Sequence, residues 1–372
     1  MSTRQPYRLI ISGGGTGGHV FPALAIANAF KERHPDAEIL FVGAEGRMEM
    51  VRVPEAGYKI IGLWISGLQR RLTLSNLSFP IKLISSFFKA RKIIHDFKPD
   101  AVVGTGGYAS GPIMLAATKN RIPSLIQEQN SYAGLTNKRL GKKVQRICVA
   151  YQGMDKYFPG EKLILCGNPV RKDIINLGAK REKALMQYAF DVNERTLLIL
   201  GGSLGARTIN ESVVNNIDRL IDAKVQVIWQ TGKGYYDSMK EQVAHKDLRR
   251  IRIHDFLKQM DMAYAASDVV ISRAGALAIS ELSLAKRPAI LVPSPNVAED
   301  HQTRNAMVLV NEQAALMIKD EDANVSLIDV ALKLLYDEAQ CQKLATNISK
   351  MGKPDATEQI VNEIEKLIKS AK

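Results

Sequence analysis

Three glycine-rich turns are the segments of this sequence best suited to chemistry. They span residues 13–19, 104–108 and 201–207, and each comes after a short apolar run. Glycine lets the backbone approach a ligand closely, and a helix that starts at such a turn points its free N–H groups at an anion. Because the turns occur in both halves of the chain, we expect two nucleotide-binding units that handle phosphates.

One titratable side chain stands at the end of the first turn. His19 lies where a helix should begin, and an imidazole can take up a proton near neutral pH, as a general base must. A histidine that caps or packs the loop is the alternative. Glu128, in the polar run 127–130 after another apolar strand, is the second candidate for the base.

The other two turns carry hydroxyl groups beside their amides. In the second turn and just after it, Gly106, Gly107, Tyr108 and Ser110 could hold a phosphate group. The third turn combines its amides with the Ser203 hydroxyl, which predicts a cradle for a pyrophosphate. It is not a P-loop, because the Gly-Lys-Ser/Thr ending is absent.

Polar segments in the second half could bind a sugar nucleotide. Glu281 lies inside a predicted helix, where it could accept both hydroxyls of a ribose, and a surface glutamate is the alternative. The polar run 299–305 follows a buried strand and could bind sugar hydroxyls. Residues 320–322 match the D-x-D pattern of metal-dependent glycosyltransferases. Their charged surroundings favour a solvated helix start instead, so no metal site is expected.

These residues must be positioned by strands and helices that alternate along the whole chain. The strands are short and apolar, as in parallel sheets covered on both faces. We expect an α/β, doubly wound fold that occurs twice, in domains 1–167 and 168–354, with a final helix at 355–372. The predicted strands are 9–11, 39–42, 101–103, 124–127, 146–149, 197–200, 225–229, 251–254, 269–272 and 289–292.

The composition is that of a soluble protein that associates with anions. The chain has 372 residues and a formal net charge of +13, which favours phosphorylated ligands, nucleic acid or an anionic membrane. It has no motif or aromatic pattern typical of nucleic-acid binding. Its three scattered cysteines indicate a reducing cytoplasm, and no apolar run is long enough to span a membrane.

Taken in order, the motifs resemble those of the MurG family. These bacterial transferases move N-acetylglucosamine from UDP-N-acetylglucosamine to lipid I, which gives lipid II for peptidoglycan. The resemblance covers nearly the whole chain, and no single motif decides it. It rests on residues 13–19, 107–112, 128–130, 167–171, 201–207, 273–276, 280–281, 300–302 and 305.

The resemblance implies a GT-B architecture, with two Rossmann-like domains, the active site in the cleft between them and the final helix packed on the first domain. It implies that Arg171 and the backbone near Leu257 adjoin the uracil, and that Glu281 binds the ribose. The diphosphate would be held by Ser203, Leu277 and Ala278.

The same resemblance implies that the donor sugar meets Asn130, His301 and Gln302. Leu204 and Ala278 depart from the glutamine and threonine that many members have. The remaining implied donor-binding residues are Thr16, Gly17, Gly18 and Ala276. The pyrophosphate of the acceptor would lie at Gly14, Gly15, Gly106, Gly107, Tyr108 and Ser110.

The stretch 77–94 carries two apolar stripes at helical spacing. One stripe is enough to dock a helix on its sheet. We expect the other, formed by Phe79, Leu83 and Phe87 beside the basic Lys82 and Lys89, to dip into an anionic bilayer. A well-buried helix is the alternative, and a lipid-linked acceptor favours the membrane surface.

We therefore expect an inverting glycosyltransferase that needs no metal and no cofactor. Its expected partners are UDP-N-acetylglucosamine, the lipid I acceptor and an anionic membrane surface, at the cytoplasmic face of the bacterial inner membrane. A UDP-N-acetylglucosamine epimerase on the same fold, a Rossmann dehydrogenase and a basic nucleic-acid-binding protein are the alternatives. The basic apolar helix and the second glycine turn argue against the epimerase, and the polar run 299–305 argues against the dehydrogenase.

Overall fold

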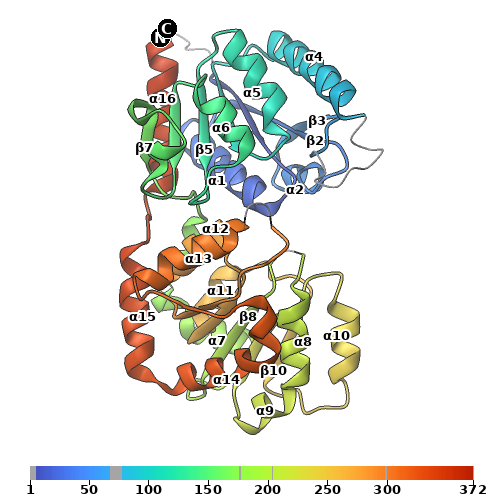
Figure 1. Cartoon of the computed structure of the whole chain (residues 1–372), viewed down its shortest axis with the longest axis vertical. Helices are drawn as coiled ribbons and strands as arrows, with labels where there is room; N and C mark the ends of the chain where they lie inside the picture. Colours follow the sequence, from blue (N-terminus) through green and yellow to red (C-terminus); the bar gives the residue numbers. More distant parts are fainter. Residues whose placement is uncertain (1–5, 68–77, 176, 203, 298–299, 372) are drawn as a thin grey trace. The chain divides into compact units, whose positions relative to one another are not determined.

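The structure, a computed structural model, describes residues 6–67, 78–175, 177–202, 204–297 and 300–371. The chain divides into two compact units, of which the first comprises Met1–Val170 with Asp355–Lys372 and the second comprises Arg171–Pro354. Each unit has one parallel sheet with helices on both faces (Figure 1). The predicted fold class, two doubly wound α/β units, is confirmed.

The first unit contains a seven-stranded sheet in the order β3-β2-β1-β4-β5-β6-β7. Every neighbouring pair is parallel, so all the strand carboxyl ends lie at one edge. The strands are β1 (Arg8–Gly13), β2 (Glu38–Ala44), β3 (Lys59–Leu63), β4 (Ala101–Gly106), β5 (Ser124–Glu128), β6 (Arg146–Val149) and β7 (Leu163–Leu165).

Alternate residues of these strands enter two separate cores. Ile10 packs with α4, α5 and α6 on one face, whereas Leu9 and Ile11 pack with α1, α2 and α16 on the other. The last helix of the chain thus belongs to the first unit, because its apolar stripe completes that second core. The helices are α1 (Gly17–Arg33), α2 (Glu49–Glu55), α4 (Phe79–Phe97), α5 (Ser110–Lys119), α6 (Leu135–Gly141) and α16 (Ala356–Ala371).

The second unit contains a six-stranded parallel sheet in the order β10-β9-β8-β11-β12-β13. Its strands are β8 (Thr196–Leu200), β9 (Gln226–Gln230), β10 (Ile251–His254), β11 (Val269–Ser272), β12 (Ala289–Leu291) and β13 (Leu316–Met317). Its helices are α7 (Arg181–Gln187), α8 (Arg207–Asn215), α9 (Ile217–Asp222), α10 (Tyr236–Val243), α11 (Met260–Ala266), α12 (Ala276–Ala285), α13 (His301–Asn311), α14 (Ala323–Tyr336) and α15 (Glu338–Lys350).

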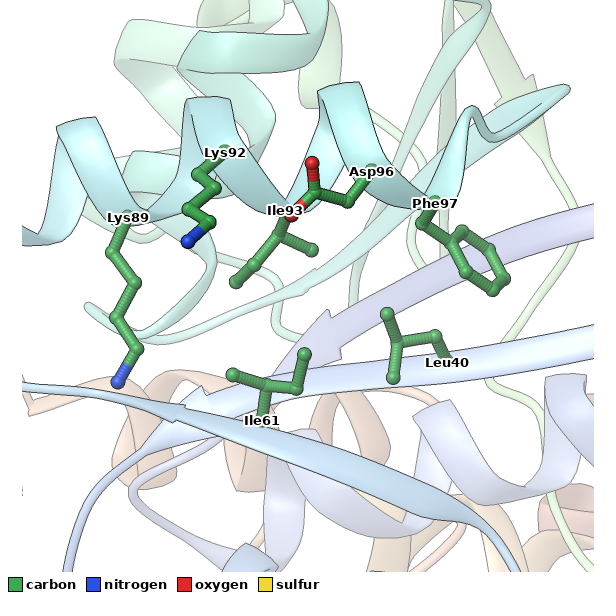
Figure 2. A pocket seen from close by; sticks show the side chains of 7 residues that line it. All are labelled: Leu40, Ile61, Lys89, Lys92, Ile93, Asp96 and Phe97. Carbon is green, nitrogen blue, oxygen red and sulfur yellow. The ribbon is translucent and has the colours of Figure 1, made fainter.

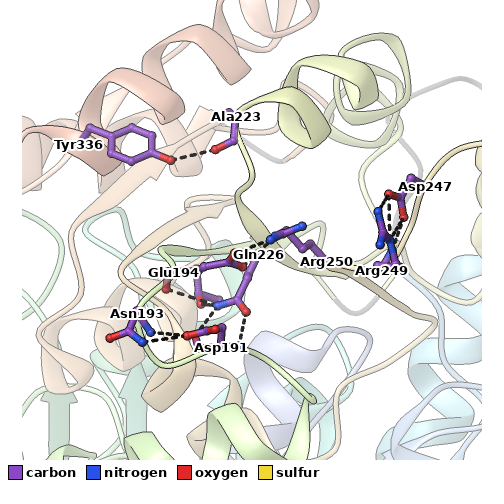
Figure 3. A network of polar contacts seen from close by, with 10 residues as sticks. Asp191, Asn193, Glu194, Ala223, Gln226, Asp247, Arg249, Arg250 and Tyr336 are labelled. Atoms are coloured by element: carbon purple, nitrogen blue, oxygen red, sulfur yellow. Dashed lines mark hydrogen bonds and ion pairs between the residues drawn. The ribbon is translucent and has the colours of Figure 1, made fainter.

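A polar network closes the end of this sheet where β8, β9 and β10 begin (Figure 3). The buried amide of Gln226 donates to the Asp191 carbonyl at 2.9 Å and to the Thr196 hydroxyl at 3.2 Å. Next to it, Arg250 donates to the Glu194 carboxylate at 2.8 Å. These contacts satisfy the hydrogen-bonding groups of the chain where it enters the strands. Ligands of such sheets bind at the opposite, carboxyl ends of the strands.

All ten predicted strands are present, and the sheets have three more: β3, β7 and β13. Each of these three lies at the edge of its sheet and is partly exposed. β13 is only two residues long, too short to be recognised as a strand, whereas β3 and β7 contain the short apolar runs Ile60–Ile61 and Leu163–Leu165, which the sequence analysis did not assign.

Candidate active site

The first two glycine turns pack against each other where β1 and β4 end. A Cβ at Gly13 would lie 1.8 Å from the Thr105 hydroxyl oxygen, and a Cβ at Gly107 would lie 2.3 Å from the Gly14 carbonyl oxygen. Gly106 and Gly107 also have φ angles of 99° and 77°, which favour glycine. The glycines are therefore needed for this backbone contact, whatever they also do for a ligand.

His19 lies half-buried in the first turn of α1, directly after the first glycine turn. Its Nδ1 is 2.9 Å from the Thr105 carbonyl oxygen and 2.9 Å from Oε1 of Gln129. Because a carbonyl oxygen only accepts hydrogen bonds, Nδ1 carries the hydrogen of the neutral ring, and Nε2 keeps its lone pair. This is the arrangement that a general base needs.

The residues between the turn and His19 form the start of α1. Thr16 precedes the helix, and its carbonyl accepts hydrogen bonds from the amides of His19 and Val20 at 3.1 Å and 3.2 Å. Thr16 and Gly18 are exposed, whereas Gly17 is buried. The two exposed residues are therefore the ones of this predicted set that a ligand can reach.

A buried carboxylate occupies the first glycine turn. Glu49, which begins α2, accepts hydrogen bonds from the amides of Gly15 and Ala44, each at 3.0 Å. A Cβ at Gly14 would lie 2.0 Å from Oε1 of this glutamate. The amide of Gly15 is thus bonded within the protein, so an acceptor pyrophosphate at Gly14 and Gly15 would have to replace or approach this carboxylate. The sequence did not reveal this competitor.

Tyr108 and Ser110 surround the same turns. A Cβ at Gly15 would lie 3.2 Å from the Tyr108 ring. Burial raises the pKa of the Tyr108 phenol, and the nearby Arg47 guanidinium partly opposes this shift. The Ser110 hydroxyl donates to the Gly107 carbonyl at 3.0 Å. The exposed Arg47, which the sequence analysis missed, adds a positive charge beside the predicted acceptor residues.

Glu128 holds the segment that follows β5. Its two carboxylate oxygens accept hydrogen bonds from the amides of Asn130 at 3.1 Å and Gly134 at 3.0 Å, and from the side chain of Asn137 at 2.9 Å. The carboxylate is buried and already saturated with donors. This geometry favours a role in positioning Asn130 over the predicted second choice as a base.

The third glycine turn is fixed by the neighbouring strand end. A Cβ at Gly205 would lie 2.2 Å from the Thr231 carbonyl oxygen. The side chain of Gln230 donates to the Gly202 carbonyl at 3.1 Å and accepts from the Leu257 amide at 2.8 Å. The Leu257 amide is therefore not available to a uracil. A backbone contact to a uracil in this segment would have to come from other atoms near Leu257.

The structure describes only one of the two residues at the tip of the third glycine turn. Ser203 lies outside the described residues. Leu204, at a position where the resemblance led us to expect a glutamine, is 83% exposed. The turn leads into α8, which begins at Arg207, and the first N–H groups of a helix have no partner within that helix. Backbone groups at this end of α8 therefore remain suited to an anion.

Glu281 and Arg171, both predicted to contact the nucleoside, lie together. The two side chains are 3.5 Å apart, and the Tyr264 hydroxyl donates to Glu281 at 3.1 Å. Burial raises the pKa of Glu281, although Arg171 and Tyr264 partly offset this effect. Burial also raises the pKa of Tyr264 well above its usual value, so its phenol stays protonated and orients the carboxylate. Tyr264 was not predicted from the sequence.

The D-x-D segment has a structural role in this unit. Asp320 pairs with Arg273 and accepts a hydrogen bond from the Thr208 hydroxyl at 2.9 Å. The predicted helix start is present, because residues 320–322 form a 3₁₀ turn directly before α14, with Glu321 and Asp322 exposed. Asp320 itself contacts the first turn of α8, directly after the third glycine turn, which was not predicted. Among the described residues, no cluster of three or more His, Cys, Asp or Glu could hold a metal ion.

Residues 276–278 form the first turn of α12, which follows Gly275. The amides of Leu277 and Ala278 point out of the helix start, where the dipole favours a negative charge. Ala276 is buried, whereas Leu277 and Ala278 are partly exposed. The amides of this turn are suited to a diphosphate without the threonine hydroxyl that the resemblance led us to expect at position 278.

Polar side chains at the start of α13 are held by the preceding loop. His301 begins the helix, and the Gln302 side chain accepts a hydrogen bond from the Ser294 amide at 2.9 Å. Asn305 is buried and donates to the Ala274 carbonyl at 3.4 Å. Gln302 is thereby tied to the loop before α13, and Asn305 ties the same helix to the loop before α12.

Comparisons with known proteins agree with this geometry. The glycosyltransferase family 28 N-terminal and C-terminal domains match residues 9–149 and 196–360. A Cytophaga hutchinsonii protein is 55% identical over 99% of both chains, and one from Parabacteroides distasonis is 53% identical over 98% of this chain and 99% of its own. Both are named UDP-N-acetylglucosamine–N-acetylmuramyl-(pentapeptide) pyrophosphoryl-undecaprenol N-acetylglucosamine transferase. The chain belongs to the MurG family.

A solved structure supports the MurG assignment. The crystal structure of Acinetobacter baumannii MurG superposes with a TM-score of 0.76 at 28% identity, covering 97% of this chain and 100% of that one. Identity above 50% along the full length also sets aside the epimerase, dehydrogenase and nucleic-acid-binding alternatives.

The exposed stripe of α4 in this MurG-family chain is not the one that was predicted. Phe79 and Phe87 are half-buried, and Phe87 packs against the core of the first unit. The exposed stripe consists of Ile81, Ile84 and Phe88, whose exposed fractions are 63%, 58% and 62%. No helix among the described residues is long and apolar enough to cross a bilayer.

The two stripes of α4 differ in how far they stay apolar along the helix, which explains why the other stripe is the exposed one. The buried stripe runs on through Ala90 and Ile94 into the last turns of α4, whereas the outward stripe becomes charged at Lys92. Leu83 is 40% exposed although it lies on the docking stripe. A stripe that must cover a sheet stays apolar along its whole length, and this signal was available in the sequence.

The predicted basic residues of α4 point to different neighbours. The Lys82 ammonium lies 5.6 Å from the centre of the Trp64 ring, and Lys89 pairs with Glu45 at 3.1 Å. Lys89 also lines a pocket of 440 Å³ between α4 and strands β2 and β3 (Figure 2). Its other lining residues are Leu40, Ile61, Lys92, Ile93, Asp96 and Phe97. Lys89 is therefore turned toward the sheet.

Sequence reasoning missed the residues that hold the predicted ones. These are Thr105 and Gln129 for His19, Glu49 for the first turn, Tyr264 for Glu281 and Gln230 for the third turn. Gln129 and Gln230 end or follow a strand at the carboxyl edge of its sheet. This position was the signal available for them, whereas Glu49 and Tyr264 lie within helices and carried none.

Proposed function

We propose that this chain transfers N-acetylglucosamine from UDP-N-acetylglucosamine to the C4 hydroxyl of the N-acetylmuramoyl-peptide of lipid I, with inversion, and so forms lipid II. The observation that carries the proposal is the full-length identity to relatives of that name, together with a histidine whose Nδ1 faces a carbonyl oxygen. A dehydrogenase or a nucleic-acid-binding protein would account for neither of these two observations.

In the proposed reaction His19 acts as the general base. Its Nε2 takes the proton of the acceptor hydroxyl while the hydroxyl oxygen attacks the anomeric carbon of the donor sugar. The bond from this carbon to the diphosphate breaks, and UDP leaves as an anion. General-base assistance of this kind is worth about 10²–10⁴-fold in rate.

The second unit supplies the groups proposed to bind the donor. Glu281, held by Tyr264 and Arg171, accepts the ribose hydroxyls. The first amides of α8 and α12 stabilise the charge of the departing diphosphate, because the positive ends of the helix dipoles favour an anion. His301 and Gln302 meet the hydroxyls of the sugar.

The proposed acceptor is lipid-linked, so the enzyme is proposed to work at the cytoplasmic face of the inner membrane. The exposed apolar side chains of Ile81, Ile84 and Phe88 on α4 support this location. Amphipathic helices insert such an apolar face into the membrane–water interface. Arg91 on the same helix is exposed and attracts anionic lipid.

The test is transfer of radiolabelled sugar from UDP-N-acetylglucosamine to a lipid I analogue. The purified protein should form a labelled disaccharide product with stoichiometric release of UDP, and should leave UDP-N-acetylglucosamine intact when the acceptor is omitted. Conversion of the donor alone to another sugar nucleotide would contradict the proposal.

A further inference from the structure

Three buried amide side chains form a chain that ends on His19. Gln127, Gln129 and Asn168 are all at most 2% exposed. Gln127 donates to Oδ1 of Asn168 at 2.9 Å, and Gln129 donates to Oε1 of Gln127. Oε1 of Gln129 lies 2.9 Å from Nδ1 of His19. Buried amides in such a series orient one another, because each must pair a donor with an acceptor.

The direction of this chain is fixed at its far end. Nδ2 of Asn168 lies 3.1 Å from the Gln129 carbonyl oxygen, and a carbonyl oxygen only accepts. The nitrogen of Asn168 must therefore face that carbonyl, and its oxygen must face Gln127. It follows that Gln127 donates to Asn168 and presents its own oxygen to Gln129.

The direction is fixed independently at the near end. The Gln129 amide nitrogen lies 2.6 Å from the Thr105 carbonyl oxygen and 3.1 Å from the Gln127 carbonyl oxygen. A flipped amide would place an oxygen against these two acceptors. The nitrogen of Gln129 therefore faces them, and its oxygen faces His19, in agreement with the far end.

We propose that Gln129, held by Gln127 and Asn168, is a positioning residue that fixes the tautomer and orientation of His19. With Oε1 of Gln129 and the Thr105 carbonyl as acceptors, the ring hydrogen stays on Nδ1 and the lone pair stays on Nε2 for the acceptor proton. The kinetic part of this inference rests on the proposed function, whereas the tautomer itself does not.

The neutral amide matters as well as its geometry. A carboxylate at this position would hold the same tautomer but would favour the charged imidazolium, which is no longer a base. The charged groups near these turns bond elsewhere: Glu128 to Asn130, Gly134 and Asn137, and Glu49 to Gly15 and Ala44. The groups that face Nδ1 are thus uncharged.

The deciding experiment combines ¹⁵N nuclear magnetic resonance of the histidine rings with kinetics. The chain has six histidines, and the His19 signals are assigned by their loss in His19→Gln. At pH 8 the wild-type ring should show a protonated Nδ1 and an unprotonated Nε2. A wild-type ring protonated at Nε2 would overturn the proposal, whether or not any variant folds.

Two variants then test the role of Gln129. In Gln129→Met only the Thr105 carbonyl still accepts from Nδ1, so the ¹⁵N signals should show a larger share of the other tautomer than in wild type, and kcat should fall about 10- to 100-fold with the donor KM nearly unchanged. In Gln129→Glu the acid limb of the kcat profile should move to higher pH by about one unit or more. A merely structural glutamine would not move that limb.

The matched control is Gln145→Met, which removes a glutamine that bonds the Ser124 amide at the other end of β5. It should change neither the tautomer nor kcat. A folded Gln129→Met with wild-type ¹⁵N signals and wild-type kcat would overturn the proposal. If His19→Gln itself keeps its activity, the base assignment in the proposed function fails, while the ¹⁵N result still decides the tautomer.

Discussion

The carboxylate of Glu49 accepts a hydrogen bond from the Gly15 amide at 3.0 Å, inside the turn whose sequence predicts a phosphate site. The same carboxylate accepts the Ala44 amide at 3.0 Å and is completely buried. A protein anion thus already occupies this turn, which stabilises its backbone before any ligand binds.

Removing this carboxylate should destabilise the first unit. Glu49→Ala leaves the half-buried amide of Gly15 and the buried amide of Ala44 without this acceptor, and each unsatisfied donor costs about 1–3 kcal/mol. We expect the free energy of unfolding in urea to fall by about 2–5 kcal/mol. Glu49→Gln, which keeps one acceptor oxygen, should lose less. A Glu49→Ala protein within about 0.5 kcal/mol of wild type would show that the carboxylate is dispensable.

His19→Ala should separate chemistry from binding. Loss of the base should lower kcat by about 10²-fold or more, while UDP binds nearly as before because Glu281 and the helix starts proposed to bind its ribose and diphosphate lie on the second unit. Steady-state kinetics and calorimetric titration with UDP measure the two effects. A kcat within a few-fold of wild type would show that another group is the base. Glu128 is a poor candidate for it, because its carboxylate already accepts hydrogen bonds from Asn130, Gly134 and Asn137.

Glu281→Ala should weaken the donor through its ribose. A lost charge-assisted hydrogen bond is worth about 1.5–3 kcal/mol, or about 10- to 150-fold in affinity. Tyr264→Phe should cause a smaller loss, because it only frees the carboxylate to move. The control ligand is 2′,3′-dideoxy-UDP, whose affinity should be the same for wild type and Glu281→Ala. If the variant weakens both ligands equally, the carboxylate does not bind the ribose.

The pH dependence of stability gives an independent test of the same carboxylate. Burial raises the pKa of Glu281 in the folded protein, so the folded state holds this proton more tightly than the unfolded chain. Stability from this group is therefore present at low pH and is lost as the pH rises through the raised pKa. The melting temperature of Glu281→Gln minus that of wild type should be larger at pH 8 than at pH 4. A constant difference in melting temperature would contradict the raised pKa.

The sequence predicted the central strands and the glycine turns because parallel strands buried on both faces are continuous apolar runs. It missed the edge strands β3, β7 and β13, which are half-exposed and short. For the site, His19 was predicted because a titratable group beside a glycine turn is visible in sequence, whereas Glu281, which lies within α12, was assigned through the resemblance to the MurG family. Their partners Gln129 and Tyr264 were not, because contacts between residues far apart in the chain depend on tertiary packing.

The exposed stripe of α4 yields the last prediction. Changing Ile81, Ile84 and Phe88 together to serine removes only outward-facing side chains, so the variant should keep its melting temperature within a few degrees of wild type, as surface changes do. It should no longer sediment with vesicles that contain phosphatidylglycerol, because the buried apolar area that drives interfacial binding is lost. It should still convert a short, water-soluble acceptor.

The matched comparison is Phe87→Ser on the same helix. Phe87 packs against the core of the first unit, so this single change should lower the melting temperature more than the triple change does. Wild-type binding should also weaken in 1 M salt, where the Debye length shrinks to about 3 Å and the lysines no longer attract the anionic surface. A folded triple variant that sediments fully with the vesicles would place the membrane contact on another surface, and an unfolded one would contradict the exposure of this stripe.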